Sequence, residues 1–285
     1  FEDIDPRYTV ALIIIKKGFP NNKKINLQGA FRSLKEFINN KVNYSEVHID
    51  DLAKYDENLA IPILPGPNTQ EIFSKMREVP SISVQDENLF HVKSCRELDA
   101  TLQKNLMDLE NKKCPEGFWP IYKGASFDLW SQDTGVYHAW GNPKKISPWI
   151  IKKRSTSNLN NNPFSEPRIL LRMITNKTNQ RTTICALVPP NIYLQHSANY
   201  LEVMNGDKKD EAFILGVLSS IPFDWFSRTF IELNFTNNFF NIMPMPRLKK
   251  ESIFFKKIVE LSGRLASSDV RFKEWANQVG VECGS

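Results

Sequence analysis

Residues 168–190 read Arg-Ile-Leu-Leu-Arg-Met-Ile-Thr-Asn-Lys-Thr-Asn-Gln-Arg-Thr-Thr-Ile-Cys-Ala-Leu-Val-Pro-Pro, so a polar, basic loop separates two apolar runs. The runs, 169–174 and 182–188, are short, aliphatic and β-branched, which favours paired half-buried strands over a helix. The loop between them supplies cations and amides, the groups that contact phosphates and base edges in nucleic acids. We therefore predict a β-hairpin whose tip is either an ordinary solvated turn or a binding element.

The composition is that of a globular chain with enough apolar residues for a packed core. Its 285 residues can hold one large domain or two smaller ones, and 41% of them are hydrophobic. No apolar stretch approaches the roughly 18 residues of a membrane span, and no signal-peptide pattern opens the chain, so we expect a cytoplasmic protein without a membrane partner. The first residue is Phe1 rather than Met, which indicates a part of a longer protein.

Basic residues are concentrated in the middle of the chain. The formal net charge of +5 is modest, and acidic residues are frequent in residues 46–57 and 71–87. Residues 141–181 contain a single acidic residue, Glu166, against the basic residues Lys144, Lys145, Lys152, Lys153, Arg154, Arg168, Arg172, Lys177 and Arg181. Such a segment with aromatic residues alongside is typical of a surface that binds a polyanion.

The order of patterns predicts an α+β protein with a domain boundary near residue 111. Residues 8–15 predict a buried strand, and a helix is expected to begin near Thr69 with Ile72, Phe73, Met76 and Val79 facing inward. Residues 97–112 predict a surface helix or an ordered arm. Aromatic strands and turns follow from residue 118, and helices are expected over 211–220 and 252–266. The last of these should bury a stripe made of Ile253, Phe254, Ile258, Leu261 and Leu265.

Signatures of catalysis are lacking. The chain contains no P-loop, no HExxH or GxSxG motif, no Cys/His cluster for zinc, and no Asn/Asp-Pro-Pro-aromatic tetrad of an adenine methyltransferase. Acid-x-Lys patterns of a nuclease type occur at 110–112 and 207–209, where chance explains them best. The histidines are isolated, and His138 alone lies beside the basic segment, where it could contact a base or phosphate. We therefore predict no catalytic residue, no metal site and no cofactor for this chain.

Several motifs, taken in order, resemble those of a known family. The series begins with residues 1–8 and the apolar run after them, and it continues with the segment 49–80 and the element Phe-Trp-Pro-Ile-Tyr-Lys-Gly-Ala at 118–125. The next block, in residues 168–182, is matched by Arg168, Arg172, Ile174, Thr175, Thr178, Asn179, Arg181 and Thr182. The series ends with Phe-Asp-Trp at 223–225, Leu-Asn-Phe at 233–235 and Met-Pro-Met-Pro at 243–246. It is similar to the C-terminal half of type IIG restriction–modification and related BREX- or DISARM-like phage-defence enzymes, in which an adenine-N6 DNA methyltransferase is fused to a target-recognition domain.

The resemblance implies a bacterial or archaeal double-stranded-DNA recognition fragment. The upstream methyltransferase domain of the same chain would be a partner and would use S-adenosylmethionine. The implied fold is α+β, with mixed sheets and β-hairpins in a target-recognition domain at 111–250, an α/β linker region at 1–110 before it and a C-terminal helical segment at 251–285.

The residues expected to contact DNA are cations and amides. Long cations neutralise phosphates, and Asn, Gln and Arg make paired hydrogen bonds to base edges. The expected set is Lys144, Lys145, Lys152, Lys153, Arg154, Arg172, Asn176, Lys177, Asn179, Arg181, Asn237 and Asn238. Arg172 could equally hold the hairpin by pairing with an acid. The alternative function is an interaction scaffold that docks the methyltransferase or a partner subunit.

Overall fold

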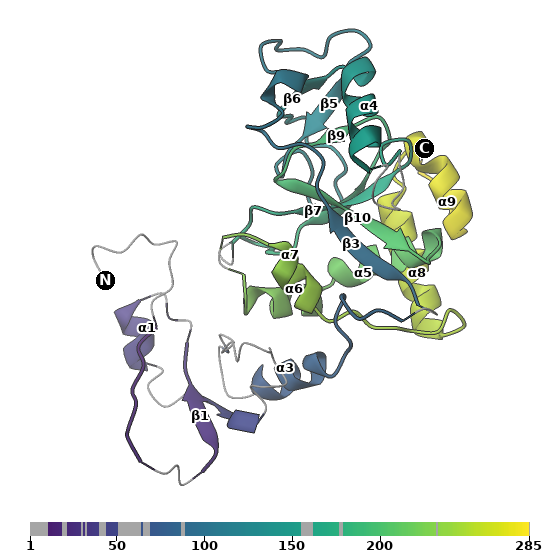
Figure 1. Cartoon of the computed structure of the whole chain (residues 1–285). Helices are drawn as coiled ribbons and strands as arrows, with labels where there is room; N and C mark the ends of the chain where they lie inside the picture. Colours follow the sequence, from purple (N-terminus) through teal and green to yellow (C-terminus); the bar gives the residue numbers. More distant parts are fainter. Residues whose placement is uncertain are drawn as a thin grey trace.

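The computed structural model shows an α+β protein built from two four-stranded sheets, a two-stranded sheet and several helices (Figure 1). The fold class predicted from the sequence is thus confirmed. Among the described residues, no helix is both long enough and apolar enough to cross a membrane. The structure describes residues 11–18, 22–29, 31, 33–39, 44–50, 64, 69–86, 89–154, 162–176, 179–231 and 233–284.

The central sheet contains the predicted hairpin. Its antiparallel strands follow the order β3 (His91–Cys95), β10 (Ala198–Met204), β7 (Arg168–Arg172) and β8 (Cys185–Val188). The hairpin over 168–190 is confirmed, because β7 and β8 pair with Leu171 opposite Cys185. Ile169 and Leu171 enter the core on one face of the sheet and Leu170 enters the core on the other. Burial on both faces explains why the two runs of the sequence are almost continuously apolar.

Helices cover one face of the central sheet. They are α5 (Lys208–Leu218), α6 (Ile221–Arg228), α7 (Asn237–Ile242), α8 (Ile253–Ala266) and α9 (Lys273–Val279). α5 begins at a capping box, in which the Asp207 side chain accepts hydrogen bonds from the backbone amides of Lys209 and Asp210. α9 ends at Gly280, whose φ of 86° lies in the left-handed region that glycine tolerates. The helices predicted over 211–220 and 252–266 are therefore confirmed.

The second sheet lies beyond the other face of the central sheet. It is mixed, with the order β4 (Met107–Asp108), β6 (Ala139–Gly141), β5 (Trp119–Tyr122) and β9 (Tyr193–Leu194), and its β5–β9 pair is parallel. Helix α4 (Pro143–Arg154) packs Ile146 and Ile150 into the core of this sheet. Figure 1 shows this sheet and α4 forming the upper part of the molecule. Because β3 and β4 precede residue 111, both sheets combine strands from either side of the boundary expected there.

The surface helix predicted over 97–112 is wrong. This segment forms turns, a short 3-10 turn at Lys104–Leu106 and strand β4. Asp99 Oδ1 accepts hydrogen bonds from the backbone amides of Thr101 and Leu102, at 2.9 and 3.2 Å. Asp108 binds the amides of residues 110 and 111 in the same way. Such local carboxylate bonds compete with helical hydrogen bonds, so they favour turns over the helix that the apolar spacing suggested.

The N-terminal part contributes a small hairpin and a docking helix. β1 (Lys24–Leu27) pairs with β2 (Ser45–His48), α1 (Leu34–Asn39) lies between them in sequence, and α3 (Thr69–Arg77) follows. In α3, Phe73 is buried and stacks on Phe226, whereas Ile72 is exposed, contrary to expectation. The buried strand predicted over 8–15 is wrong for residues 11–15, which form no strand and expose Leu12 to Ile15. Residues 8–10 lie outside the described residues.

Helix α8 buries a neighbouring face rather than the one predicted, and Ile258 of the predicted stripe is partly buried. Ile253, Phe254, Leu261 and Leu265 are exposed, and Phe255, Val259, Ser262, Gly263 and Ala266 are buried instead. The cause is close packing against α5. A Cβ added to Gly216 of α5 would lie 2.7 Å from Ile258 Cγ2 and 3.2 Å from Ser262 Cβ. The lack of a side chain at Gly216 thus makes room on α5 for Ile258 and Ser262 of α8.

Candidate nucleic-acid interface

Helix α4 presents an exposed basic surface. Lys144, Lys145 and Lys152 are exposed, and α4 contains no acidic residue. Lys144 and Lys152 are eight residues apart, or about 12 Å along the helix axis. At about 100° per residue, Lys145 and Lys152 project within about 20° of each other and Lys144 lies about 80° from Lys152. Among the described residues, no carboxylate forms an ion pair with Lys144 or Lys145. The sequence showed these lysines but not the helix, because Pro143 and Pro148 are usually taken as helix breakers.

The last two cations of α4 turn toward the protein. Lys153 donates a hydrogen bond from Nζ to the backbone oxygen of Glu97 at 3.0 Å and lies 5.0 Å from the Trp149 ring centroid. Burial, followed by the charge of Arg96, lowers the pKa of Lys153. Arg154 is buried and pairs with Glu202 at 2.6 Å. Arg154 therefore joins α4 to the central sheet and is not placed to reach a ligand in solvent.

The hairpin loop is fixed by one buried carboxylate. Asp224 of α6 accepts hydrogen bonds at Oδ1 from the backbone amides of Thr182 and Thr183, each at 2.7 Å. Its Oδ2 accepts a hydrogen bond from Arg228 Nε at 2.9 Å. Arg228 also donates to the backbone oxygens of Asn179 and Gln180. The loop is thus bonded to α6 along much of its length and is not a solvated turn alone.

Two arginines of the hairpin point inward. Arg181 Nη2 donates to the backbone oxygens of Ser219 and Ser220, at 2.6 and 3.1 Å, and its Nε lies 3.5 Å from Asp224 Oδ1. Arg172 donates to the backbone oxygen of Phe127 and lies 5.8 Å from that ring's centroid. Burial lowers the pKa of Arg172, although it still leaves a guanidinium charged at neutral pH. Both side chains therefore hold the loop, and Arg172 does so mainly through a carbonyl rather than the acid that the sequence suggested.

The amide residues of the predicted set lie at one end of the central sheet. A bridge joins Ile174 to Asn234, and the backbone amide of Phe235 donates to Met173 at 2.7 Å, so α7 begins beside the hairpin loop. Asn237 and Asn238, in the first turn of α7, are exposed. Asn176 and Asn179 are half-buried, and Asn176 Oδ1 accepts a hydrogen bond from the Asn179 amide at 3.0 Å. Lys177 lies outside the described residues.

The predicted residues therefore form two groups rather than one. The lysines of α4 belong to the second sheet, whereas the hairpin loop and α7 belong to the core on the opposite face of the central sheet. The ribbon views agree with this separation, since α4 lies in the upper part of Figure 1 and α6 and α7 lie below the central sheet. Within the described residues of 141–181, the cations do not form the single continuous basic surface that the charge distribution suggested.

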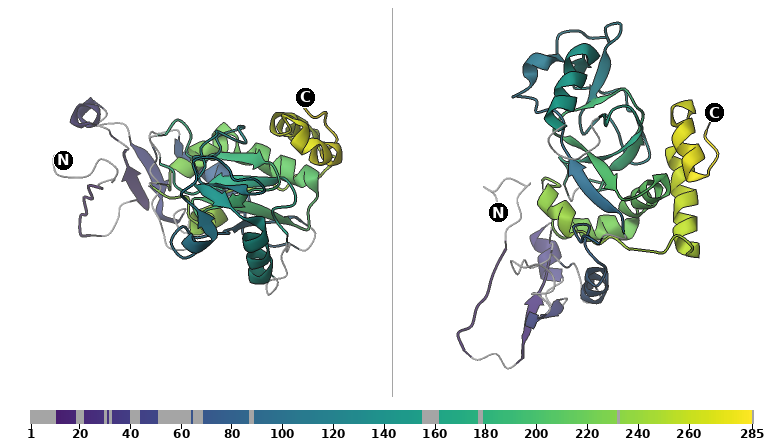
Figure 2. Two further views of the ribbon diagram at one scale, coloured as in Figure 1. Left: turned by 90° about the horizontal axis from the view of Figure 1, so that it is seen from above. Right: turned by 45° about the vertical axis from the view of Figure 1, so that its right-hand side comes forward.

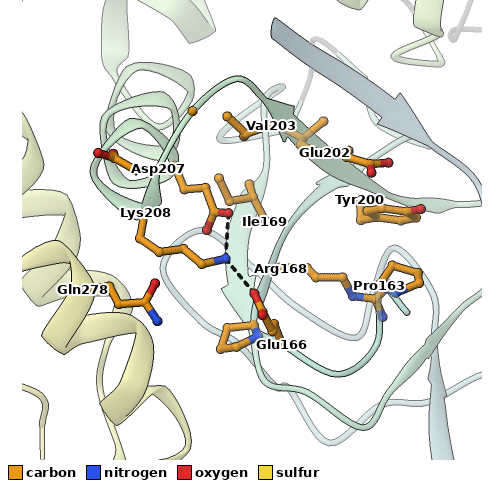
Figure 3. A pocket seen from close by; sticks show the side chains of 14 residues that line it. Pro163, Glu166, Arg168, Ile169, Tyr200, Glu202, Val203, Asp207, Lys208 and Gln278 are labelled. Atoms are coloured by element: carbon orange, nitrogen blue, oxygen red, sulfur yellow. Dashed lines mark hydrogen bonds and ion pairs between the residues drawn. The ribbon is translucent and has the colours of Figure 1, made fainter. Parts of the chain in front are cut away.

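Arg168 belongs to a cleft of about 330 Å³ between β7, β10, α5 and α9 (Figure 3). It is buried and pairs with the buried Glu97, whose Oε2 accepts a hydrogen bond from the Leu194 amide at 2.9 Å. Lys208 bridges Glu166 and Glu211, with both contacts at 2.9 Å. The cleft is lined by the acids Glu166, Glu202, Asp207 and Glu211 but by only two basic residues, Arg168 and Lys208. This negative balance makes the cleft a poor site for a phosphate group.

Aromatic residues near the basic segment, and His138, make contacts within the protein. Tyr137 stacks on Tyr122 and donates a hydrogen bond to Asp133, and Trp140 Nε1 donates to the Asn111 backbone oxygen at 2.8 Å. His138 is half-buried, and burial, with a smaller effect of Lys123, lowers its pKa. The part of the chain that the structure describes has no group of three or more His, Cys, Asp or Glu residues able to hold a metal ion.

The sequence did not predict the contacts that Glu97, Asp224 and Arg228 make, although Asp224 belongs to the Phe-Asp-Trp motif at 223–225. The spacing of Asp224 and Arg228, four residues apart in a helix, predicts an ion pair but not the contact with the hairpin loop. A scan of protein-family models and a search of curated proteins find no match to this chain.

Proposed function

We propose that this chain is a double-stranded-DNA recognition module of an adenine-N6 methyltransferase of the restriction–modification or phage-defence type. The exposed basic surface of α4 is the observation that carries this proposal. The resemblance of the motif series assigns catalysis and S-adenosylmethionine to an upstream domain, so recognition is the task left for this chain.

The lysines of α4 suit contacts with the phosphate backbone. Lys144, Lys145 and Lys152 are exposed and have long side chains, and they span about 12 Å along the helix axis, a length that covers several phosphates along one strand of a duplex. Each phosphate that a lysine neutralises releases counterions, which makes binding fall with salt concentration. This contact gives affinity without sequence preference.

The amides at the end of the central sheet suit contacts with base edges. Asn side chains form paired hydrogen bonds with adenine in the major groove, and Asn237 and Asn238 are exposed at the start of α7. Residues 179–183 of the neighbouring loop are held by Asp224 and Arg228, so their backbone is in place before a ligand arrives. A fixed loop loses little conformational freedom on binding, which favours affinity.

Charge reversal on α4 tests the phosphate contacts. Binding of a labelled duplex is measured by fluorescence anisotropy at several salt concentrations for the native chain and for the triple variant Lys144→Glu, Lys145→Glu, Lys152→Glu. We expect the slope of log affinity against log salt to fall by about 3, because each phosphate contact contributes about 0.9. The matched control, Lys249→Glu with Lys256→Glu and Lys273→Glu, reverses three exposed lysines outside α4 and should leave the slope almost unchanged. Equal effects of the two variants would refute the assignment to α4.

Amide removal tests base contacts separately. Asn237→Ala with Asn238→Ala should leave the salt slope unchanged and should relax the preference in a selection from a randomised duplex library. The expected loss of discrimination is about 1–3 kcal/mol for each base contact removed. If the selected sequences are the same for the native chain and this variant, α7 does not read bases.

A further inference from the structure

The outer face of α8 is apolar and uncovered. Phe254, Leu261 and Leu265 are 71%, 48% and 53% exposed. The inner face, with Phe255, Val259 and Ala266, already belongs to the core of the protein. Both views of Figure 2 place α8 and α9 at the edge of the molecule. Exposed apolar residues that gather on one surface mark an interaction site more often than scattered ones do.

The spacing of these residues is that of a helix-pairing seam. Phe254, Leu261 and Leu265 are seven and four residues apart, and Ile258, which lies between them at the edge of the stripe, also packs against Gly216 of α5. Intervals of four, three and four residues are those of the a and d positions of a coiled coil. At about 100° per residue, the three exposed side chains fall within about 40° of one another around the helix. The outer face of α8 therefore offers a narrow stripe of the width that a second helix covers.

One side of the seam is basic. Lys257 and Arg264 lie along this side, at the positions that contact the flank of a paired helix. On the other side of the seam, Phe255 and Ser262 are buried in the protein. α8 contains three basic residues, Lys256, Lys257 and Arg264, against the single acid Glu260, a net charge of +2. Glu260 lies 2.9 Å from Lys257 and 3.8 Å from Arg264, but both pairs are exposed and such pairs are weak.

We propose that α8 docks an amphipathic helix of a partner protein, with apolar residues at coiled-coil spacing and acidic residues along its flanks. A second copy of this chain fits poorly. An antiparallel pair of α8 helices would place Lys257 and Arg264 against the same basic residues of the other copy. An acidic helix instead covers the apolar seam and neutralises these two cations. This contact is separate from DNA binding, because it uses none of the residues of α4, α7 or the hairpin loop.

Designed peptides test the proposal without a known partner. The probe is a labelled synthetic helix of about four heptads with Leu at the a and d positions and Glu at e and g, where mutual repulsion keeps it from pairing with itself. The comparison peptide has Lys at e and g. We expect the native chain to bind the Glu peptide at least about tenfold more tightly than the Lys peptide in fluorescence anisotropy.

Variants of the chain assign the binding to the seam. Phe254→Glu with Leu261→Glu should abolish binding of the Glu peptide, whereas Ile221→Glu, at a residue 75% exposed on α6, should leave it unchanged. Lys257→Glu with Arg264→Glu should reverse the preference toward the Lys peptide. Circular dichroism checks that each variant remains folded, which is expected because all five side chains are exposed.

Three results would overturn the proposal. Equal binding of the two peptides would show that α8 does not prefer an acidic partner. Binding that survives Phe254→Glu with Leu261→Glu would show that the peptide does not bind at the seam. Sedimentation that finds a dimer of the native chain and a monomer of that variant would assign the face to a second copy instead.

Discussion

Three lysines of α4 and three arginines of the hairpin carry the same charge but differ in their exposure. On α4, the side chains of Lys144, Lys145 and Lys152 are exposed. In the hairpin, Arg168 pairs with Glu97, Arg172 donates to a backbone carbonyl, and Arg181 donates to the end of α5. The three arginines bind fixed acceptors of the protein itself. Arginine suits that task because its planar group forms several hydrogen bonds at once, whereas lysine presents a compact, strongly hydrated charge.

The difference teaches that local charge density does not identify a binding surface. Both regions belong to residues 141–181, the most basic part of the chain. The acids that neutralise the hairpin arginines, Glu97 and Asp224, are distant in sequence, so they do not enter any local count. The arginines of the hairpin therefore stabilise the fold, whereas the exposed lysines of α4 form a basic surface.

The largest expected effect comes from breaking the buried pair in the hairpin. Arg168→Leu leaves the Glu97 carboxylate buried with one remaining bond, from the Leu194 amide, so the free energy of unfolding should fall by about 3–5 kcal/mol. Chemical denaturation measures this loss. Adding Glu97→Gln should restore more than half of it, because the amide retains an acceptor without a charge. A double variant no more stable than the single one would contradict the importance of this pair.

A smaller effect is expected from Asp224→Ala. The amides of Thr182 and Thr183 then lose their acceptor, and Arg181 and Arg228 lose a carboxylate, so the free energy of unfolding should fall by about 3 kcal/mol. Hydrogen exchange at the amides of Thr182 and Thr183 should become faster at the same time. Asp224→Asn, which retains an oxygen acceptor, serves as the matched control and should slow exchange again. Unchanged exchange in Asp224→Ala would mean that the loop does not depend on this bond.

The smallest expected effect on stability is at α4, and it has the opposite sign. Lys144→Glu with Lys145→Glu places carboxylates in the first turn of α4, where the helix dipole favours negative charge, so the free energy of unfolding should rise by about 0.5 kcal/mol. The same variant should weaken duplex binding. A thermal unfolding scan beside the anisotropy measurement checks both. A destabilised variant would mean that these lysines also hold the fold.

The sequence predicted elements better than it predicted their contacts. The hairpin strands follow from aliphatic and β-branched runs, and α5 and α8 follow from their apolar spacing. The buried face of α8 could not be predicted in this way, because both of its faces are apolar and Gly216 of α5 decides which one packs. The prediction of a strand over residues 11–15 was wrong for a related reason, since an apolar run forms a strand only where another strand is available to pair with it.

The candidate site was predicted by residue type and not by position. The lysines of α4 are placed as expected for a surface, but nothing local distinguishes them from Arg154 or Arg181, whose acceptors lie 48 and 38 residues away in sequence. A preference of lysine for solvent and of arginine for multidentate internal contacts is the one general rule that would have sorted them.

The bonds between Arg228 and the hairpin loop have a consequence for how this surface can change in evolution. Arg228 binds the main-chain oxygens of Asn179 and Gln180, and Asp224 binds the main-chain amides of Thr182 and Thr183. Main-chain groups are the same for almost every amino acid, so replacement of the Gln180 side chain leaves these bonds in place. The loop can therefore acquire new side chains, and with them new surface chemistry, while the hairpin that carries it remains where it is.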